Sequence, residues 1–176
     1  MKKNILNELG KRIVFFDGGM GTLLQERGLE AGELPENWNL EHPDIIRELH
    51  RDYLNAGADI ILANTFGANE LKFPDNLEEI ALDVGPTGKL LKPLGTLDFE
   101  DAVSIFARTI KAGAAAGADL ILIETMSDTY ELKAAMLAAK ENSDLPVMAT
   151  VIFGENGKML TGATPEAVTA LLEGLG

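Results

Sequence analysis

A seven-residue stretch occurs twice in this chain, as Ala-Gly-Ala-Asp-Ile-Ile-Leu at 56–62 and as Ala-Gly-Ala-Asp-Leu-Ile-Leu at 116–122. Each copy predicts the end of a helix, a glycine turn and a buried strand, because a short apolar run follows the glycine. The residues after the two copies differ, with Ala-Asn-Thr-Phe-Gly at 63–67 and Ile-Glu-Thr-Met-Ser at 123–127. A repeated scaffold whose strand ends carry different polar residues is typical of a (β/α) barrel.

Strands and helices alternate along the rest of the chain, which predicts a parallel sheet with right-handed crossovers. The predicted strands are 12–16, 59–63, 80–84, 119–123 and 147–153, and the predicted helices are 22–27, 43–56, 99–115, 128–142 and one that begins at Thr164. Asp98 is predicted to cap the helix 99–115, and Asp128 with Glu131 resembles a capping box. Residues 28–40 are predicted to form a loop.

The predicted fold class is α/β, a parallel (β/α) TIM-barrel type, with about the first five of eight βα units in one domain over residues 1–176. Residues 65–80 leave scarcely enough room for the covering helix that a parallel crossover requires. The barrel is therefore predicted to be shortened between its second and third strands, at about 67–80. The final residues, 173–176, resemble the turn that precedes each strand, so we expect this chain to be part of a larger barrel.

The composition sets limits on function. A formal net charge of -13 argues against binding to nucleic acid or to an anionic membrane, because both require clustered Lys or Arg. The sequence has no apolar run long enough to span a membrane and begins without an apolar leader, so we expect a cytoplasmic protein. The absence of cysteine excludes disulfides, thiolate zinc ligands and cysteine nucleophiles.

Two other features resemble functional motifs only superficially. His42 and His50 lie near the start and in the third turn of one predicted helix and lack the i, i+4 spacing of a helical metal pair, which favours a surface or capping role. The stretch Gly-Pro-Thr-Gly-Lys at 85–89 is too short between its glycines for a phosphate-binding loop.

Polar residues follow each predicted strand, at the edge of the sheet where parallel α/β folds bind ligands. They are Asp17-Gly18-Gly19, Asn64-Thr65, Asp83, Glu124-Thr125 and Thr150. Asp17 and Glu124 would face a common mouth, where two carboxylates can hold an ammonium group or act as acid and base. Strand-end carboxylates also cap helices or bind loop amides, and the spacing alone leaves both readings open.

At these residues the sequence resembles the homocysteine-binding barrel of the cobalamin-dependent methionine synthases, within the wider homocysteine S-methyltransferase family. The six matching stretches occur in the family's order and cover nearly the whole chain. They are Phe-Asp-Gly-Gly-Met-Gly-Thr at 16–22, Asn-Trp-Asn-Leu at 37–40, Ala-Asn-Thr-Phe-Gly-Ala at 63–68, Asp-Val-Gly-Pro-Thr-Gly at 83–88, Ile-Glu-Thr-Met-Ser-Asp at 123–128 and Leu-Thr-Gly at 160–162.

The resemblance implies which residues bind the substrate. Asp17 and Glu124 would hold the amino acid part of L-homocysteine, and the backbone N–H groups of the glycines Gly18 and Gly19 would lie near its carboxylate. Asn64 and Thr65 would line the same mouth. The family transfers a methyl group to the homocysteine thiol in methionine biosynthesis, so the resemblance implies a methyltransferase domain.

The resemblance also implies cofactors that this chain does not hold by itself. Family enzymes bind zinc through three cysteines, which this sequence lacks, and cobalamin and methyltetrahydrofolate bind to other modules of the parent enzyme. The isolated chain is therefore expected to be inactive. One alternative is a non-catalytic half-barrel fragment that self-associates through open sheet edges at its first and fifth strands. An unrelated lyase or aldolase barrel would suit Asp17 and Glu124 but not the six matches.

Overall fold

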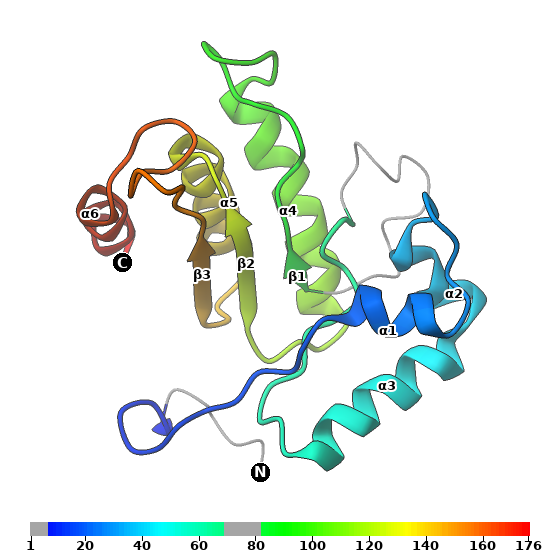
Figure 1. Ribbon diagram of the computed structural model, residues 1–176. Helices are drawn as coiled ribbons and strands as arrows, with labels where there is room; N and C mark the ends of the chain where they lie inside the picture. The colour runs from blue at the N-terminus through cyan, green and yellow to red at the C-terminus, as the bar shows by residue number, and fades with distance from the viewer. Residues whose placement is uncertain (1–6, 69–81) are drawn as a thin grey trace. The chain divides into compact units, whose positions relative to one another are not determined.

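A computed structural model describes residues 7–68 and 82–176 of the chain (Figure 1). The chain divides into two compact units, Met1–Asn64 and Thr65–Gly176. The predicted shortening at about 67–80 lies almost entirely outside the described residues. Among the described residues, no helix combines the length and the apolar character that crossing a membrane would require.

The first unit is mainly helical. Its elements are α1 (Met20–Glu26), the 3-10 helix η2 (Pro35–Asn37), α2 (Trp38–Glu41) and α3 (Pro43–Ala56). α1 and α3 confirm the two helices predicted here, and α3 ends at Gly57, whose φ of 106° is left-handed. The prediction of a loop over 28–40 is wrong for its last part, because buried Trp38 anchors the short helices. The core of this unit consists of Leu24, Leu29, Trp38, Ile46 and Leu49.

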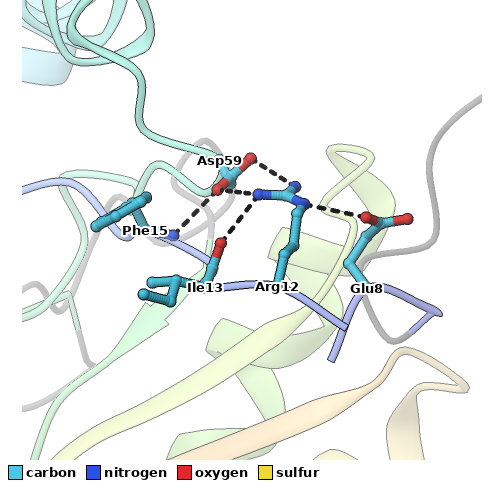
Figure 2. Close-up of polar contacts among 5 residues, drawn as sticks. All are labelled: Glu8, Arg12, Ile13, Phe15 and Asp59. Atoms are coloured by element: carbon cyan, nitrogen blue, oxygen red, sulfur yellow. Dashed lines mark hydrogen bonds and ion pairs between the residues drawn. The ribbon is translucent and has the colours of Figure 1, made fainter. Parts of the chain in front are cut away.

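The two strands predicted in the first unit are reduced to one parallel bridge, between Phe16 and Ile60. Part of the hydrogen bonding of this pairing comes from a side chain. The Asp59 carboxylate accepts the Phe15 backbone N–H at 3.1 Å and two bonds from the Arg12 guanidinium at 2.8 and 2.7 Å (Figure 2). A carboxylate that occupies a backbone donor of a strand prevents a regular ladder there, which explains why the prediction of full strands is wrong.

The second unit contains a three-stranded parallel sheet. Its strands are β1 (Asp83–Val84), β2 (Ile121–Met126) and β3 (Val147–Val151), in the order β1-β2-β3. The helices α4 (Phe99–Ala115) and α5 (Thr129–Asn142) lie on the same side of the sheet, and α6 (Pro165–Leu175) packs against α5 (Figure 1). Parallel pairing and the alternation of strands and helices are confirmed.

The core of the second unit lies between this sheet and its helices. Fully buried members include Ile121, Ile123 and Met126 from β2 and Phe106 and Ile110 from α4. The strand β2 runs to Met126 rather than ending at the predicted residue 123. An irregularity in its pairing with β3 carries the strand through the polar residues that follow the apolar run.

The predicted helix caps are confirmed only in part. Asp128 accepts the Tyr130 backbone N–H at 2.9 Å, as an N-cap residue does. The prediction for Asp98 is wrong, because its carboxylate bonds to the Lys92 ammonium at 2.8 Å instead of the first turn of α4. The capping box is also incomplete, since Glu131 turns away from the Asp128 backbone and bonds to Thr87.

Candidate functional site

Asp17 lies where the bridged segments of the first unit end. Its Oδ2 accepts the Leu62 backbone N–H at 2.9 Å, and its Oδ1 is buried without a hydrogen-bond partner among the described residues. Burial raises the pKa of the Asp17 carboxyl, while the Leu62 N–H and the charge of His50 act in the opposite direction. One carboxylate oxygen is therefore fixed by the backbone, and the other can accept from a donor that residues 7–68 and 82–176 do not supply.

One side chain of α3 packs against the turn that follows Asp17, and a second acts on Asp17 through its charge. The Tyr53 hydroxyl donates to the Gly19 carbonyl at 3.2 Å, and a Cβ at Gly18 would lie 3.0 Å from the same hydroxyl. His50 lies one turn earlier on the helix, close enough for its charge to act on Asp17. Glycine at position 18 thus permits close packing of the helix on the turn.

The predicted surface role is confirmed for His42, which is exposed, but not for His50. The Nε2 atom of His50 is buried without a hydrogen-bond partner among the described residues, so a surface role is wrong for this ring nitrogen. His42 occupies the N-cap position of α3 but makes no capping bond, and its ring packs edge-on against Trp38 with centroids 4.5 Å apart. His50 and Tyr53 are three residues apart on α3, and this spacing is the sequence signal that both lie on the same face of the helix.

Asn64 anchors the end of the second bridged segment. Its amide nitrogen donates to the Pro35 carbonyl at 2.7 Å and to the Asn39 side-chain oxygen at 3.2 Å, and Asn39 donates back to the Asn64 carbonyl at 2.7 Å. The residue is buried. This amide pair ties the strand end to η2 and α2, and the involvement of Asn39 could not be inferred from the spacing of strand ends.

Thr65 plays a comparable part at the start of the second unit. Its hydroxyl donates to the Asp83 carbonyl at 3.0 Å and accepts the backbone N–H groups of Leu82 and Asp83 at 3.0 and 2.6 Å. With 2% of its surface exposed, this side chain joins the segment after the second predicted strand to β1. Its hydroxyl is engaged by the backbone.

The loop 85–88 at the carboxyl end of β1 is held from two sides. The Gly85 N–H donates to the Phe66 carbonyl at 3.1 Å, and a Cβ at Gly85 would lie 2.3 Å from that oxygen, so only glycine fits. On the other side, the Thr87 N–H and hydroxyl donate to one carboxylate oxygen of Glu131 at 2.8 and 2.5 Å. Burial raises the pKa of Glu131, whose exposed fraction is 3%, against the effect of these bonds.

Glu124 lies half-buried near the end of β2. The next residue, Thr125, has a φ of 62°, in the left-handed region, and its N–H donates to the Thr150 hydroxyl at 2.8 Å. The predicted site residues thus fall on both units. Asp17, Gly18, Gly19 and Asn64 lie in the first and Thr65 and Glu124 in the second.

A bound zinc ion does not fit the residues that the structure describes. The sequence has no cysteine, and no group of three potential metal ligands exists among His, Asp and Glu side chains in 7–68 and 82–176. A thiolate zinc site therefore cannot be built from these residues.

The chain is similar in sequence to known methyltransferases. The model of the family described as homocysteine S-methyltransferase matches residues 14–79 and 72–175. Methionine synthases of Mycobacterium leprae (strain TN) and Mycobacterium tuberculosis (strain ATCC 25618 / H37Rv) are each 30% identical to the chain over 215 residues. These alignments cover 98% of the chain but only 18% of each relative, so the chain spans less than a fifth of their length.

Solved structures give the same fold. The metallated form of the homocysteine methyltransferase MmuM from Escherichia coli matches with a TM-score of 0.84 and 20% sequence identity, covering 98% of this chain and 75% of that one. The apo form matches with a TM-score of 0.76 and 23% identity over 98% and 72% of the two chains. At these identities the likeness establishes an α/β fold of the TIM-barrel type.

Proposed function

Because the chain belongs to the homocysteine S-methyltransferase family, we propose that it binds L-homocysteine at the carboxyl ends of its strands, as a substrate domain of a methyltransferase. The observation that carries this proposal is the state of Asp17. One of its oxygens is fixed by the Leu62 N–H, and the other is buried without a partner among the described residues. A half-buried carboxylate with one unused oxygen suits an ammonium group, which brings three donors.

The ammonium group of homocysteine would be held by carboxylates. Asp17 supplies one and Glu124 is proposed as the second. Recognition requires Asp17 to be ionised, and burial raises its pKa, so affinity should rise with pH as this group loses its proton. Bound ammonium would in turn favour the charged form of Asp17 and lower its pKa.

The carboxylate of homocysteine would approach the turn after Asp17. Gly18 and Gly19 are exposed and have no Cβ, so a ligand can come close to their backbone. Asn64 and Thr65 are proposed to shape the mouth. The Asn64 side chain bonds to the Pro35 carbonyl and the Thr65 side chain to the Asp83 carbonyl, so each would fix the backbone that surrounds the proposed site.

The methyl-transfer step would need groups outside this chain. The unperturbed pKa of a thiol is about 8.5, so free homocysteine at neutral pH is mostly protonated and a poor nucleophile. In the proposed parent enzyme, zinc would activate the thiol and cobalamin and methyltetrahydrofolate would bind to other parts. The chain alone is proposed to bind substrate without transferring a methyl group.

A second candidate, a non-catalytic half-barrel fragment that self-associates, is favoured by one observation. Ile13 and Phe15, in the first bridged segment, are 73% and 57% exposed. Large exposed apolar side chains favour association with another chain. Sedimentation velocity distinguishes the candidates, since this role predicts a concentration-dependent mass and no homocysteine binding.

Calorimetric titration with L-homocysteine tests the proposed function. The chain should bind homocysteine, and Asp17→Asn should weaken binding by about tenfold or more, the size of a hydrogen bond to a charged group. The matched control is Asp144→Asn, at an exposed turn position, which should bind like the unmodified chain. The des-amino analogue of homocysteine, which lacks the ammonium group, should bind weakly to both Asp17→Asn and Asp144→Asn. Equal binding of homocysteine by Asp17→Asn and Asp144→Asn would refute the assignment of Asp17.

A further inference from the structure

The strand β2 contains a bulge at the residue proposed to bind the ammonium group. Ile123 pairs with Ala149 and Met126 pairs with Val151. Two residues of β2, Glu124 and Thr125, therefore lie opposite the single residue Thr150 of β3. Bulges of this kind are rare between parallel strands and are enriched at barrel rims and next to active sites, where they redirect a side chain.

The bulge changes which residues face the helices. Ile121 and Ile123 are fully buried in the core beneath α4 and α5, so by alternation Glu124 lies on the opposite face of the sheet. In a regular strand, Met126 would share the face of Glu124. The extra residue restores Met126 to the helix-facing core, where it is also fully buried. The carboxylate can thus lie on the face opposite α4 and α5 while the last core residue of the strand stays buried.

Two threonines maintain this geometry. Thr125 adopts a φ of 62°, which is unfavourable for a β-branched residue and persists only where surrounding structure fixes it. Its N–H, displaced from the regular ladder, donates to the Thr150 hydroxyl at 2.8 Å. This bond joins the bulge to the neighbouring strand at the one residue that the bulge spans.

We propose that Thr125 and Thr150 are positioning residues that hold Glu124 toward the ammonium group of the substrate. This inference rests on the proposed function and adds the device that aims one of its two carboxylates. Backbone strain of this kind is retained where it serves a site. A strand needed only for packing could continue into α5 without a left-handed residue.

Variants of the full 176-residue chain test the role of Thr125. Thr125→Gly accepts a positive φ without strain, so its melting temperature should match or exceed that of the unmodified chain. Its Kd for L-homocysteine should rise about tenfold, because Glu124 is no longer held. In a chain that already carries Glu124→Gln, Thr125→Gly should cause no further rise in Kd for L-homocysteine. Thr125→Gly should leave Kd for the des-amino analogue unchanged, whether residue 124 is Glu or Gln.

Variants of Thr150 test the hydrogen bond. Thr150→Val removes the acceptor of the Thr125 N–H and should weaken homocysteine binding, whereas Thr150→Ser keeps a hydroxyl and should restore it. The matched control for Glu124→Gln is Glu155→Gln, in an exposed turn.

The outcomes separate the two proposals. If homocysteine binding needs Glu124 but Thr125→Gly and Thr150→Val bind normally, the positioning role is overturned and the proposed function stands. The positioning role is also overturned if Thr125→Gly weakens homocysteine binding by the same factor in the unmodified chain and in Glu124→Gln. If the unmodified chain binds no homocysteine, both proposals fail.

Discussion

The two copies of the repeated stretch begin alike and end differently. Gly57 and Gly117 have φ values of 106° and 92°, so each copy turns through the same left-handed glycine. After the turn, the first copy forms one bridge at Ile60, whereas the second enters the six-residue strand β2. Nearly identical sequences thus give the same turn but unequal strands, which teaches that the neighbours of a segment decide how far its strand extends.

The surroundings of the two copies account for this difference. The second copy pairs with β1 on one side and β3 on the other, beneath α4 and α5. The first copy is bridged to residues 15–17, where the Asp59 and Asp17 carboxylates accept the backbone N–H groups of Phe15 and Leu62. In this pairing the two carboxylates accept backbone N–H groups that would otherwise form the hydrogen bonds of a regular parallel strand pair.

The largest expected effect concerns packing at the equivalent isoleucines. Ile121 is fully buried and Ile61 is half-buried, so Ile121→Ala should lower the free energy of unfolding by about 2–5 kcal/mol and Ile61→Ala by less. Urea unfolding followed by circular dichroism measures both. Equal losses would show that the two copies are packed alike, contrary to this account.

The polar residues after the copies should separate stability from binding. Asn64→Ala removes two donated bonds at a buried position and should cost about 1–3 kcal/mol of stability. Glu124→Gln, at the equivalent but only half-buried position, should cost less stability than Asn64→Ala and should weaken homocysteine binding. Thermal unfolding and calorimetry on both variants provide the comparison, and a large loss of stability in Glu124→Gln would contradict it.

The glycine turns should respond equally. A Cβ at either Gly57 or Gly117 would meet no atom within 4 Å, so substitution by alanine introduces only the strain of a positive φ. Each change should cost about 1–2 kcal/mol. Chemical denaturation would detect a difference, and markedly unequal costs would mean that the shared turn is not held in the same way.

A smaller effect is expected in the pH dependence of the second unit. The pKa of Glu131 in the folded chain lies above its ordinary value of 4.5, because the group is buried. The folded state therefore binds this proton more tightly than the unfolded state, and stability should fall as pH rises through the interval between the two pKa values. Glu131→Gln keeps an acceptor for Thr87 and should flatten this part of the stability profile. If Glu131→Gln leaves the dependence of stability on pH unchanged, Glu131 is not the group responsible for it.

Much of the second unit was predictable from the sequence because its signals are local. The helix 99–115 has the predicted limits, and β3 begins at the predicted residue 147 but ends at 151 instead of 153. Apolar periodicity and flanking turns specify these boundaries. The first unit departs further from prediction. Its strand pairing depends on contacts of Asp59 with Arg12 and Phe15, more than forty residues away in sequence, which no local pattern encodes.

The candidate site was predictable as a set of strand-end residues but not in its supporting contacts. Asp17 and Glu124 follow apolar runs, which is a sequence signal. The roles of His50 and Glu131 arise from helices packed on distant loops, and Glu131 was misassigned because the spacing from Asp128 also fits a capping box. The bulge at Thr125 has no sequence signal, since threonine is an ordinary strand residue.

The central claim is that this chain binds homocysteine through carboxylates on its strand ends and not through zinc. Its most direct test is calorimetric titration of the purified chain with L-homocysteine in the presence of zinc and in the presence of a chelator. We expect the same Kd in both conditions, with binding weakened by Asp17→Asn. Binding that requires zinc, or no binding in either condition, would contradict this account.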